Sequence, residues 1–484
     1  MSLLIAVLLF GFEAANSSAA IELEGQDTKS AKKSPTKEQE GTLEPFKFKV
    51  KVDLVTTDVT VIGNPVSELR AEDFTVLDNG KPQEMSYFSQ DQIPLAVALV
   101  VDTSLTTQRY LPVLQIAGGS ALRHLKSDDQ VALYSFNAKP KRIGNLTNDR
   151  VQVAKEIGKF EFQYGTDIYY AIRDAANYLR EKAPNRRRAI ILVSDNCHYG
   201  MSDITSQNAR NKSLEAAATL YSVRTPGLWN ADSMWCADPN IVVKKLAEDT
   251  GGELIDTLTW TSLPEAMEQA VMNLRKQYTL GFNPSASGAQ GSYHQLAVKL
   301  LSEDRCPGCR VLSRAGYFEG IAAPLPQQEK SPAAPKRTEA ETDQMLIQQS
   351  ILTAGTYEVD WPGLPFTFTT AAQKDSNGQP QVKLDLKIDS KLIKFNTVDG
   401  KHACKLHITV FYVNAGGKIL GSEWKILDAQ LKEETYWQAM KSGMLYSTIV
   451  PVKTEKQMIK IVVYDELSDR AGSKSIWLAE TFPQ

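Results

Sequence analysis

The stretch LAVALVVDTSLTT, from Leu95 to Thr107, changes abruptly from apolar residues to an aspartate followed by hydroxyl side chains. A continuous apolar run of this length is typical of a strand that is buried on both faces of a sheet. Asp102, Ser104 and Thr106 follow at the point where such a strand would end. Oxygen-rich loops of this kind bind a hard metal ion or cap the helix that comes next. The rest of the chain has to distinguish these alternatives.

The composition is that of an ordinary globular protein. The chain has 484 residues, of which 42% are hydrophobic and 23% charged, and its formal net charge is −3. This length predicts several domains. Because the net charge is small and no basic stripe with interleaved aromatic residues occurs, we expect no binding to nucleic acid.

The N-terminal segment has features of an export signal. Residues 1–12, MSLLIAVLLFGF, are apolar, and small residues around Ala19 and Ala20 form a candidate cleavage zone, although no basic residues precede the apolar run. The run is shorter than the roughly 20 residues that a membrane-spanning helix needs. We therefore expect a cleaved signal peptide and a secreted or periplasmic protein. An uncleaved anchor is the alternative, and only then would a membrane be a partner.

From Pro94 onward, short apolar segments alternate with segments of helical spacing. LAVALVV, QVALYSF and RAIILVS predict buried strands, and residues 167–183 place apolar side chains on one helical stripe. This alternation predicts an α/β domain with a central, doubly wound, mostly parallel sheet of the Rossmann-like kind, covered by helices on both faces. Ligands of such sheets bind at the carboxyl ends of the strands.

The segments on both sides of this domain are rich in β-structure signals. PFKFKVKVDLV, residues 45–55, alternates with period two, Asn79-Gly80 predicts a tight hairpin turn, and the C-terminal segments alternate in the same way. The predicted organisation is a signal peptide (1–20), a disordered linker (21–44), an N-terminal β module (45–93), the α/β domain (94–283), a β extension of that domain (284–320), a linker (321–347) and a C-terminal immunoglobulin-like β-sandwich (348–484).

Two further loops carry polar residues to the edge of the predicted sheet. YGTD places Thr166 directly before a helix, and RAIILVSD ends in Asp195 after another buried strand. Each loop alone could be a helix cap or a turn. Three such loops at one edge instead bring two carboxylates and three hydroxyls together, an oxygen set that suits Mg²⁺ or Mn²⁺. The predicted ligands are Asp102, Ser104, Thr106, Thr166 and Asp195.

These loops resemble a known metal site. DTSLT, YGTD and ILVSD are similar, in order and spacing, to the D-x-S-x-S, Thr and Asp elements of the metal-ion-dependent adhesion site (MIDAS) of von Willebrand factor type A (vWA) domains. Outside the domain, VTVIGNPVSELRAEDFTVLDNGKPQEMSYF, QYTLGFNP, RVLSRAGYF and IVVYDELSDRAGSKS resemble segments of the VWFA-related family of secreted acidobacterial proteins. The resemblance covers most of the chain after the predicted signal.

The resemblance implies a role for each predicted ligand. The hydroxyls of Ser104 and Thr106 would contact the metal directly, and Thr166 would do so when a partner is bound. Asp102 and Asp195 would hold metal-bound waters or bind the ion more closely. A coordination position left to water would accept a carboxylate from a protein partner, as in metal-bridged adhesion.

The chain departs from the adhesion-site pattern at two positions. Thr106 replaces the usual serine, which keeps the hydroxyl and adds a methyl group that narrows the site. Asn196 follows Asp195 where glycine is usual. Because asparagine adopts left-handed backbone geometry more readily than most residues, we expect this change to be mild.

Cysteine and tryptophan residues near this edge suggest further features. We expect the CPGC segment to form a Cys306–Cys309 disulfide. We also expect a Cys197–Cys236 disulfide that braces the metal face; the alternative is that Cys197 and Cys236 are free thiols. Aromatic residues often anchor interfaces, so Trp229 and Trp235, with His198, are candidates for a partner-binding rim. Packing within the loop explains the tryptophans equally well.

These observations favour a binding protein without enzymatic activity. Its ligand would be a protein that offers an acidic residue to the metal ion. The alternative is a secreted structural scaffold in which the metal site is vestigial and the β modules bind partners. A hydrolase or redox enzyme that uses the region around Asp102, Asp195 and His198, or the CPGC segment, is the third hypothesis, although no serine or cysteine is paired with a base.

Overall fold

The computed structural model describes residues 54–478, apart from gaps at 64, 67, 91–92, 227–236, 258, 285–288, 302, 321–336 and 455–456. The predicted signal peptide, the linker 21–44 and most of the alternating segment 45–55 lie outside this part of the chain. Within it, no helix combines the length and apolar character that crossing a membrane requires.

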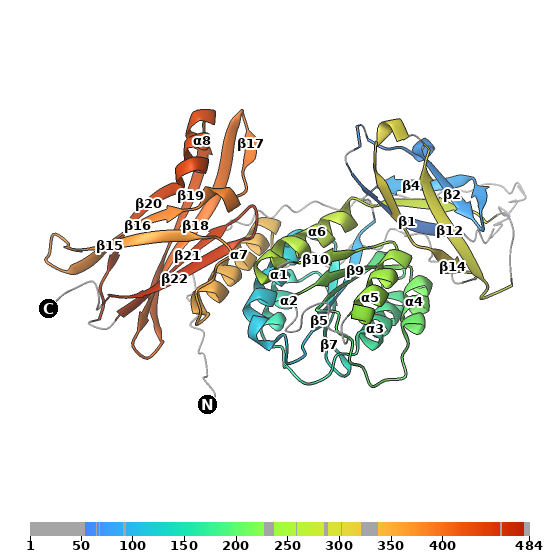
Figure 1. Ribbon diagram of the computed structural model, residues 1–484, viewed down its shortest axis with the longest axis horizontal. Helices are drawn as coiled ribbons and strands as arrows, with labels where there is room; N and C mark the ends of the chain where they lie inside the picture. Colours follow the sequence, from blue (N-terminus) through green and yellow to red (C-terminus); the bar gives the residue numbers. More distant parts are fainter. Residues whose placement is uncertain are drawn as a thin grey trace, which may run out of the picture. The chain divides into compact units, whose positions relative to one another are not determined.

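The central domain is built around a six-stranded sheet (Figure 1). Its strands lie in the order β10-β9-β8-β5-β6-β7, and every neighbouring pair is parallel except β6 and β7. The strands are β5 (Leu95–Asp102), β6 (Gln130–Phe136), β7 (Pro140–Thr147), β8 (Arg187–Ser194), β9 (Ala218–Arg224) and β10 (Leu254–Asp256). The ends of β5 and β8 are therefore neighbours at one edge of the sheet.

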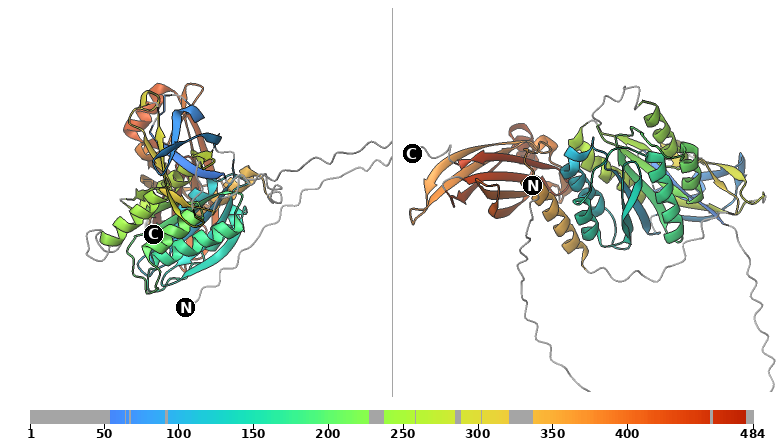
Figure 2. Two further views of the ribbon diagram at one scale, coloured as in Figure 1. Left: turned by 90° about the vertical axis from the view of Figure 1, so that its right-hand side faces the viewer. Right: turned by 90° about the horizontal axis from the view of Figure 1, so that it is seen from below.

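Helices cover both faces of this sheet, as the views in Figure 2 also show. The odd-numbered residues of β5 pack against α1, α2 and α6, and the even-numbered ones share a second core with α3, α4 and α5. The predicted doubly wound α/β fold is confirmed. The helices are α1 (Leu111–Arg123), α2 (Arg150–Ile157), α3 (Ile168–Lys182), α4 (Ser206–Glu215), α5 (Ala237–Asp249) and α6 (Leu263–Arg275).

A separate β module is built from segments on both sides of the α/β domain. Its two four-stranded sheets have the orders β13-β1-β11-β4 and β14-β12-β2-β3. The strands are β1 (Val55–Ile62), β2 (Phe74–Asp78), β3 (Lys81–Gln83), β4 (Met85–Gln90), β11 (Tyr278–Phe282), β12 (Tyr293–Leu300), β13 (Arg310–Ser313) and β14 (Gly316–Phe318). The predicted turn joins β2 to β3, with positive φ at Asn79 and Gly80.

This pairing changes one predicted boundary. Residues 284–320 do not extend the central sheet, because β12 pairs with β2 and β13 pairs with β1. Strand β11, which was predicted to belong to the α/β domain, pairs with β1 and β4 instead. Strand alternation is a local signal and gives no information about a partner some 200 residues away, so the error has a simple cause.

The C-terminal module consists of two antiparallel sheets around one hydrophobic core. One sheet has the order β15-β16-β20, and the other has the order β17-β18-β21-β22, with β19 also paired to β18. Two packed β-sheets were expected here, while the immunoglobulin-like topology stays a prediction. The strands are β15 (Phe366–Lys374), β16 (Pro380–Ile388), β17 (Asn396–Val398), β18 (Lys401–Asn414), β19 (Ile419–Leu431), β20 (Met444–Pro451), β21 (Gln457–Asp465) and β22 (Ala471–Trp477), with α8 (Glu433–Ser442) before β20.

Helix α7 (Glu339–Thr356) lies where the sequence predicted a linker and the start of the sandwich. The linker prediction is wrong for residues 339–347, because the charged first turns of the helix resemble linker composition. A capping box marks its start, in which Thr338 accepts from the Glu341 amide and the Glu341 carboxylate accepts from the Thr338 amide. Leu346 and Ile351 then enter the core that the helix shares with α1.

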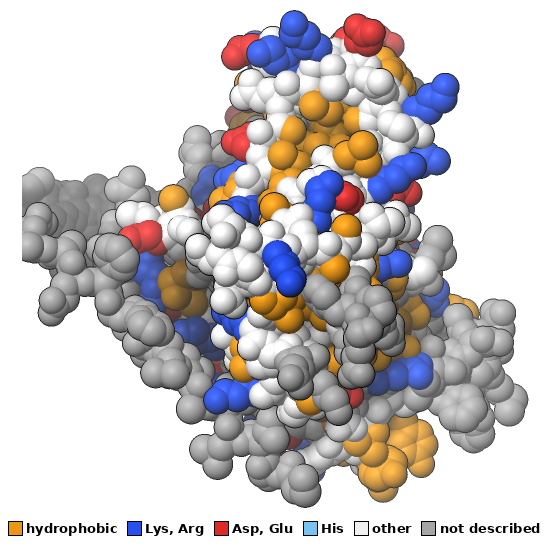
Figure 3. Space-filling model, turned by 90° about the vertical axis from the view of Figure 1, so that its left-hand side faces the viewer, with side chains coloured by type: hydrophobic (Ala, Val, Ile, Leu, Met, Phe, Trp, Pro, Cys, Tyr) orange, Lys and Arg blue, Asp and Glu red, His pale blue; other side chains and the backbone are white. Residues whose placement is uncertain are grey.

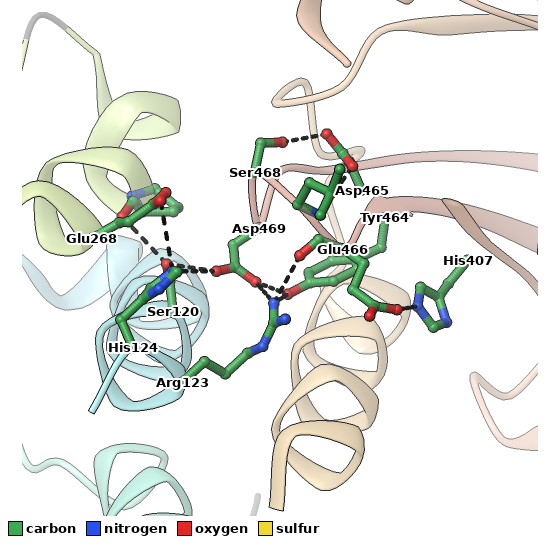
Figure 4. Close-up of polar contacts among 12 residues, drawn as sticks. Ser120, Arg123, His124, Glu268, His407, Tyr464, Asp465, Glu466, Ser468 and Asp469 are labelled. Atoms are coloured by element: carbon green, nitrogen blue, oxygen red, sulfur yellow. Dashed lines mark hydrogen bonds and ion pairs between the residues drawn. The ribbon is translucent and has the colours of Figure 1, made fainter. Parts of the chain in front are cut away.

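Polar contacts join α1 to the turn between β21 and β22 (Figure 4). The carboxylate of Asp469, which is 1% exposed, accepts hydrogen bonds from Ser120, Arg123 and Tyr464 and lies 3.6 Å from Nε2 of His124. We call these five residues the Asp469 network. Although burial opposes ionisation, His124 and the Arg123 charge hold the pKa of Asp469 below its ordinary value.

Candidate metal site

The loop after β5 is organised around the carboxylate of Asp102. Its Oδ1 accepts the Ser104 amide at 2.8 Å, and its Oδ2 accepts the Ser194 hydroxyl at 2.7 Å. The Ser104 and Thr106 hydroxyls lie 2.8 Å apart, while Thr107 donates to the backbone oxygens of Asp102 and Ser104. Thr107 is therefore used inside the loop, and the Ser104 and Thr106 hydroxyls form a pair.

Backbone contacts bring the other two loops to the same edge. Ser104 forms an isolated parallel bridge with Gln163, and Thr166 forms an antiparallel bridge with Tyr199, four residues after Asp195. Asp167, not Thr166, caps α3 by accepting the Tyr170 amide at 3.1 Å. The structure therefore brings the predicted ligands of all three loops to one sheet edge and leaves the Thr166 hydroxyl without a hydrogen bond to any described residue.

The two carboxylates at this edge are buried and lack a positive partner. Asp102 is 1% and Asp195 is 8% exposed, and neither forms an ion pair with a described residue. Burial, together with the nearby charge of Asp195, raises the pKa of Asp102 to about 7. Burial also raises the pKa of Asp195. A bound cation would lower the free-energy cost of ionising both carboxyl groups.

One pair of predicted ligand oxygens has the separation that a small divalent ion would need. In an octahedral Mg²⁺ site with bonds of about 2.0–2.1 Å, neighbouring ligand atoms lie about 2.9 Å apart. The hydrogen bond between Ser104 and Thr106 holds their hydroxyls at a similar separation. Among the described residues, no group of three or more His, Cys, Asp and Glu side chains could hold a metal ion, so a site here would depend on hydroxyl ligands.

The residue after Asp195 has the backbone geometry that its position requires. Asn196 has φ of +59°, in the left-handed region. Its side chain is fully buried and exchanges hydrogen bonds with the Ser222 hydroxyl, and it also donates to Asn240. Asparagine thus replaces glycine here at little backbone cost and ties the end of β8 to β9 and α5.

The cysteines and the predicted rim are described only in part. Cys306 and Cys309 form a disulfide, and Cys404 is free and buried. Cys197 also takes part in a disulfide, but Cys236 lies outside the described residues, so their pairing stays a prediction. Trp229 and Trp235 lie outside them as well.

His198 lies in the loop after β8, where it is half-buried against the first residues of α3. Its Nδ1 accepts the Ile168 amide at 3.3 Å, and its ring lies 4.1 Å from that of Tyr169. Burial lowers its pKa. These contacts are those of a packed side chain, and a role for His198 in partner binding stays a prediction.

Sequence reasoning missed four exposed apolar residues at this edge. Leu105 is 36% exposed between two predicted ligands, Tyr164 is 84% exposed two residues before Thr166, and Tyr199 and Met201 are 70% and 88% exposed after β8. Single exposed apolar side chains are common, but several of them gathered at one place on the surface often mark an interaction site. Their positions inside the same three loops were the available signal. We call these four residues the apolar rim.

Residues 97–198 match the family model of the von Willebrand factor type A domain. The chain contains a vWA domain. The match begins in β5 and ends three residues after Asp195, so it includes all five predicted metal ligands. No curated protein sequence matches the chain.

Similar solved structures share low sequence identity with the chain. An aerotolerance-related membrane protein from Bacteroides fragilis is 15% identical, with 37% of this chain and 98% of that chain covered and a TM-score of 0.30. The vWF domain of the type V pili tip protein Mfa5 from Porphyromonas gingivalis is 12% identical, with 38% and 95% covered and a TM-score of 0.32. A von Willebrand factor type A protein from Catenulispora acidiphila is 11% identical, with 62% and 81% covered and a TM-score of 0.33.

Proposed function

We propose that this is an exported binding protein whose vWA domain engages a protein partner through a bound Mg²⁺ or Mn²⁺ ion. Asp102, Ser104, Thr106, Thr166 and Asp195 would hold the ion. The resemblance to the VWFA-related acidobacterial secreted family, and export by an N-terminal signal, are parts of the same proposal. No catalytic step is assigned, because Nδ1 of His198 accepts a backbone amide and the two CPGC cysteines are joined.

One observation carries the proposal. Asp102 and Asp195 are buried together at a sheet edge, and among the described residues no lysine, arginine or histidine pairs with either. Buried charges in proteins are normally paired or bind metals. A divalent ion would balance both carboxylates, and hard oxygen ligands favour Mg²⁺ or Mn²⁺.

The apolar rim supports a partner of mixed chemistry. An acidic side chain of the partner would complete the coordination of the ion, while Tyr164, Tyr199 and Met201 would contact apolar residues around it. Aromatic residues and methionine are enriched in protein interfaces, and tyrosine is common among the residues that contribute most to binding. We therefore expect the acidic residue to lie within an apolar stretch of the partner.

Calorimetric titration of Mg²⁺ and Mn²⁺ into the full chain tests the metal site. We expect one binding site in the parent protein and none in Asp102→Ala. Asp203→Ala is the matched control, because Asp203 is an exposed aspartate near the same edge and its loss changes the net charge equally. Binding that survives in Asp102→Ala, or that is lost in Asp203→Ala as well, would contradict the assignment.

The second candidate is a structural scaffold with a vestigial metal site. It is favoured by the continuous core in which α7 and β21 join the vWA domain, since a joint of this kind suits a rigid connector. Partner binding that is unaffected by chelation of divalent ions and by Asp102→Ala would support the scaffold over metal-dependent adhesion.

A further inference from the structure

The C-terminal module contains a cavity of about 620 Å³ away from the candidate metal site. It lies among the start of β15, the end of β16, the end of α8 and β22. A cavity of this size is in the range that holds a small molecule or several residues of a peptide. None of the predicted functional residues lines it.

The floor of the cavity is apolar. Trp361, Leu364, Phe366 and Ile388 line it and are nearly or fully buried, and Met440 adds a half-buried thioether from the last turn of α8. The indole nitrogen of Trp361 makes no hydrogen bond to a described residue, so its N–H is available to a ligand. Because the first four are already almost completely shielded, an apolar group of an occupant would cover chiefly Met440 and the small exposed parts of Trp361 and Phe366.

The rim of the cavity is basic. Lys387, Lys391, Lys441 and Lys474 line it together with one acidic residue, Asp389. None of the four lysines forms an ion pair with a described residue, whereas Lys383, Lys394 and Lys405 elsewhere in the module are paired with carboxylates. On the side of the module seen in Figure 3, hydrophobic side chains likewise gather among Lys and Arg side chains.

An unpaired strand edge adjoins the cavity. Phe366 and Thr367, which line it, are the first residues of β15. Strand β15 pairs only with β16 among the described strands, so its other edge has backbone groups free to bond. Edges of this kind accept an additional strand from a peptide. A lipid chain would make no use of them, whereas an extended peptide would.

We propose that this cavity and the β15 edge form a second binding site, which takes an extended acidic peptide segment of a protein partner. The peptide backbone would pair with β15, an apolar side chain would enter the cavity beside Trp361 and Phe366, and carboxylates would meet the four lysines. This site is independent of the metal ion and of the proposed vWA function.

Fluorescence anisotropy with a fluorescein-labelled (Glu-Val)5 peptide and the full chain tests the site. We expect saturable binding at low ionic strength, weaker by about tenfold or more in the Lys387→Glu, Lys474→Glu double variant, because each reversal replaces attraction by repulsion. Lys418→Glu, Lys425→Glu is the matched control: both lysines are exposed, Lys418 in the turn before β19 and Lys425 within β19 on the other sheet, and the net charge changes equally. A (Lys-Val)5 peptide should not bind.

Hydrogen exchange supplies a second measurement, which does not depend on the variants folding. The (Glu-Val)5 peptide should slow amide exchange in residues 366–374, whereas Mg²⁺ alone should not. The proposal is overturned if the peptide does not bind, if the control pair weakens binding as much as the test pair, or if β15 gains no protection. Binding of phosphatidylglycerol vesicles, but not of the peptide, would instead assign the cavity to a lipid.

Discussion

Asp102 and Asp469 are both buried to 1% exposure, yet their surroundings differ. Asp469 receives Arg123, Tyr464 and Ser120 from its own chain, and its pKa is held low. Asp102 receives a backbone amide and the Ser194 hydroxyl, faces the charge of Asp195, and its pKa is raised to about 7.

The difference separates a structural joint from a candidate binding site. A buried carboxylate whose countercharge is built into the chain stabilises the folded protein only as part of its network. A buried carboxylate without a countercharge costs stability until something else supplies the charge. The Asp469 network therefore explains how the C-terminal module is fastened to α1, and the Asp102 edge is where an external cation would act.

The largest effect is expected from breaking the joint. Arg123→Ala leaves Asp469 buried without its cation, and we expect a loss of about 3–5 kcal/mol in the free energy of unfolding. Urea denaturation would measure it. The double variant Arg123→Ala, Asp469→Ala should lose much less than the sum of the single losses, because the second change removes the stranded charge. Additive losses would show that Arg123 and Asp469 do not act as a pair.

The stability of the metal-free protein should depend on pH through Asp102. Its carboxyl ionises more easily unfolded than folded, so between about pH 4 and pH 7 the folded state binds more protons and the free energy of unfolding falls as pH rises. A change from 3.8 to about 7 corresponds to at most about 4 kcal/mol, present below pH 4 and lost by about pH 7. Urea denaturation in EDTA at several pH values would measure the loss.

Two controls assign this loss to the candidate site. Asp102→Asn should flatten the pH dependence over the same interval, and saturating Mg²⁺ should restore stability at pH 7 by mass action. The Asp469 network titrates in the opposite sense, since a carboxyl with a lowered pKa contributes stability that is lost as pH falls. A pH profile that Asp102→Asn leaves unchanged would contradict the role given to this carboxyl.

Substitutions of Asn196 should have a smaller effect on stability, and they test whether the loop after β8 keeps its conformation without metal. Asn196→Gly keeps the left-handed backbone and loses the hydrogen bonds to Ser222 and Asn240, at a cost of about 1–3 kcal/mol. Asn196→Ala adds backbone strain of about 1–2 kcal/mol. In thermal unfolding without metal, Asn196→Gly should have a higher unfolding temperature than Asn196→Ala. Equal stabilities would mean that the φ of +59° is not maintained.

The same contrast marks what the sequence could predict. Three local patterns were sufficient to predict the central sheet: the apolar run of β5, the helical stripe of α3 and the order of the three loops. They also predicted that Asp102, Thr166 and Asp195 would lie at one edge, where the structure has them. The pairing of β11 with β1 and the contacts of Asp469 with α1 join residues hundreds of positions apart, and no local pattern encodes them. The apolar rim was missed because exposure is a property of the folded loop.

The smallest effect is expected at the apolar rim. Because Tyr199 and Met201 are 70% and 88% exposed, Tyr199→Ser and Met201→Ser should each change the free energy of unfolding by less than about 0.5 kcal/mol. They should also leave Mg²⁺ affinity unchanged in calorimetry, since neither is a predicted ligand. Side chains that contribute to neither folding nor metal binding would be free to contact the proposed partner. A loss of more than about 1 kcal/mol in either variant would instead show that the side chain packs against its own chain, and the rim would then be structural.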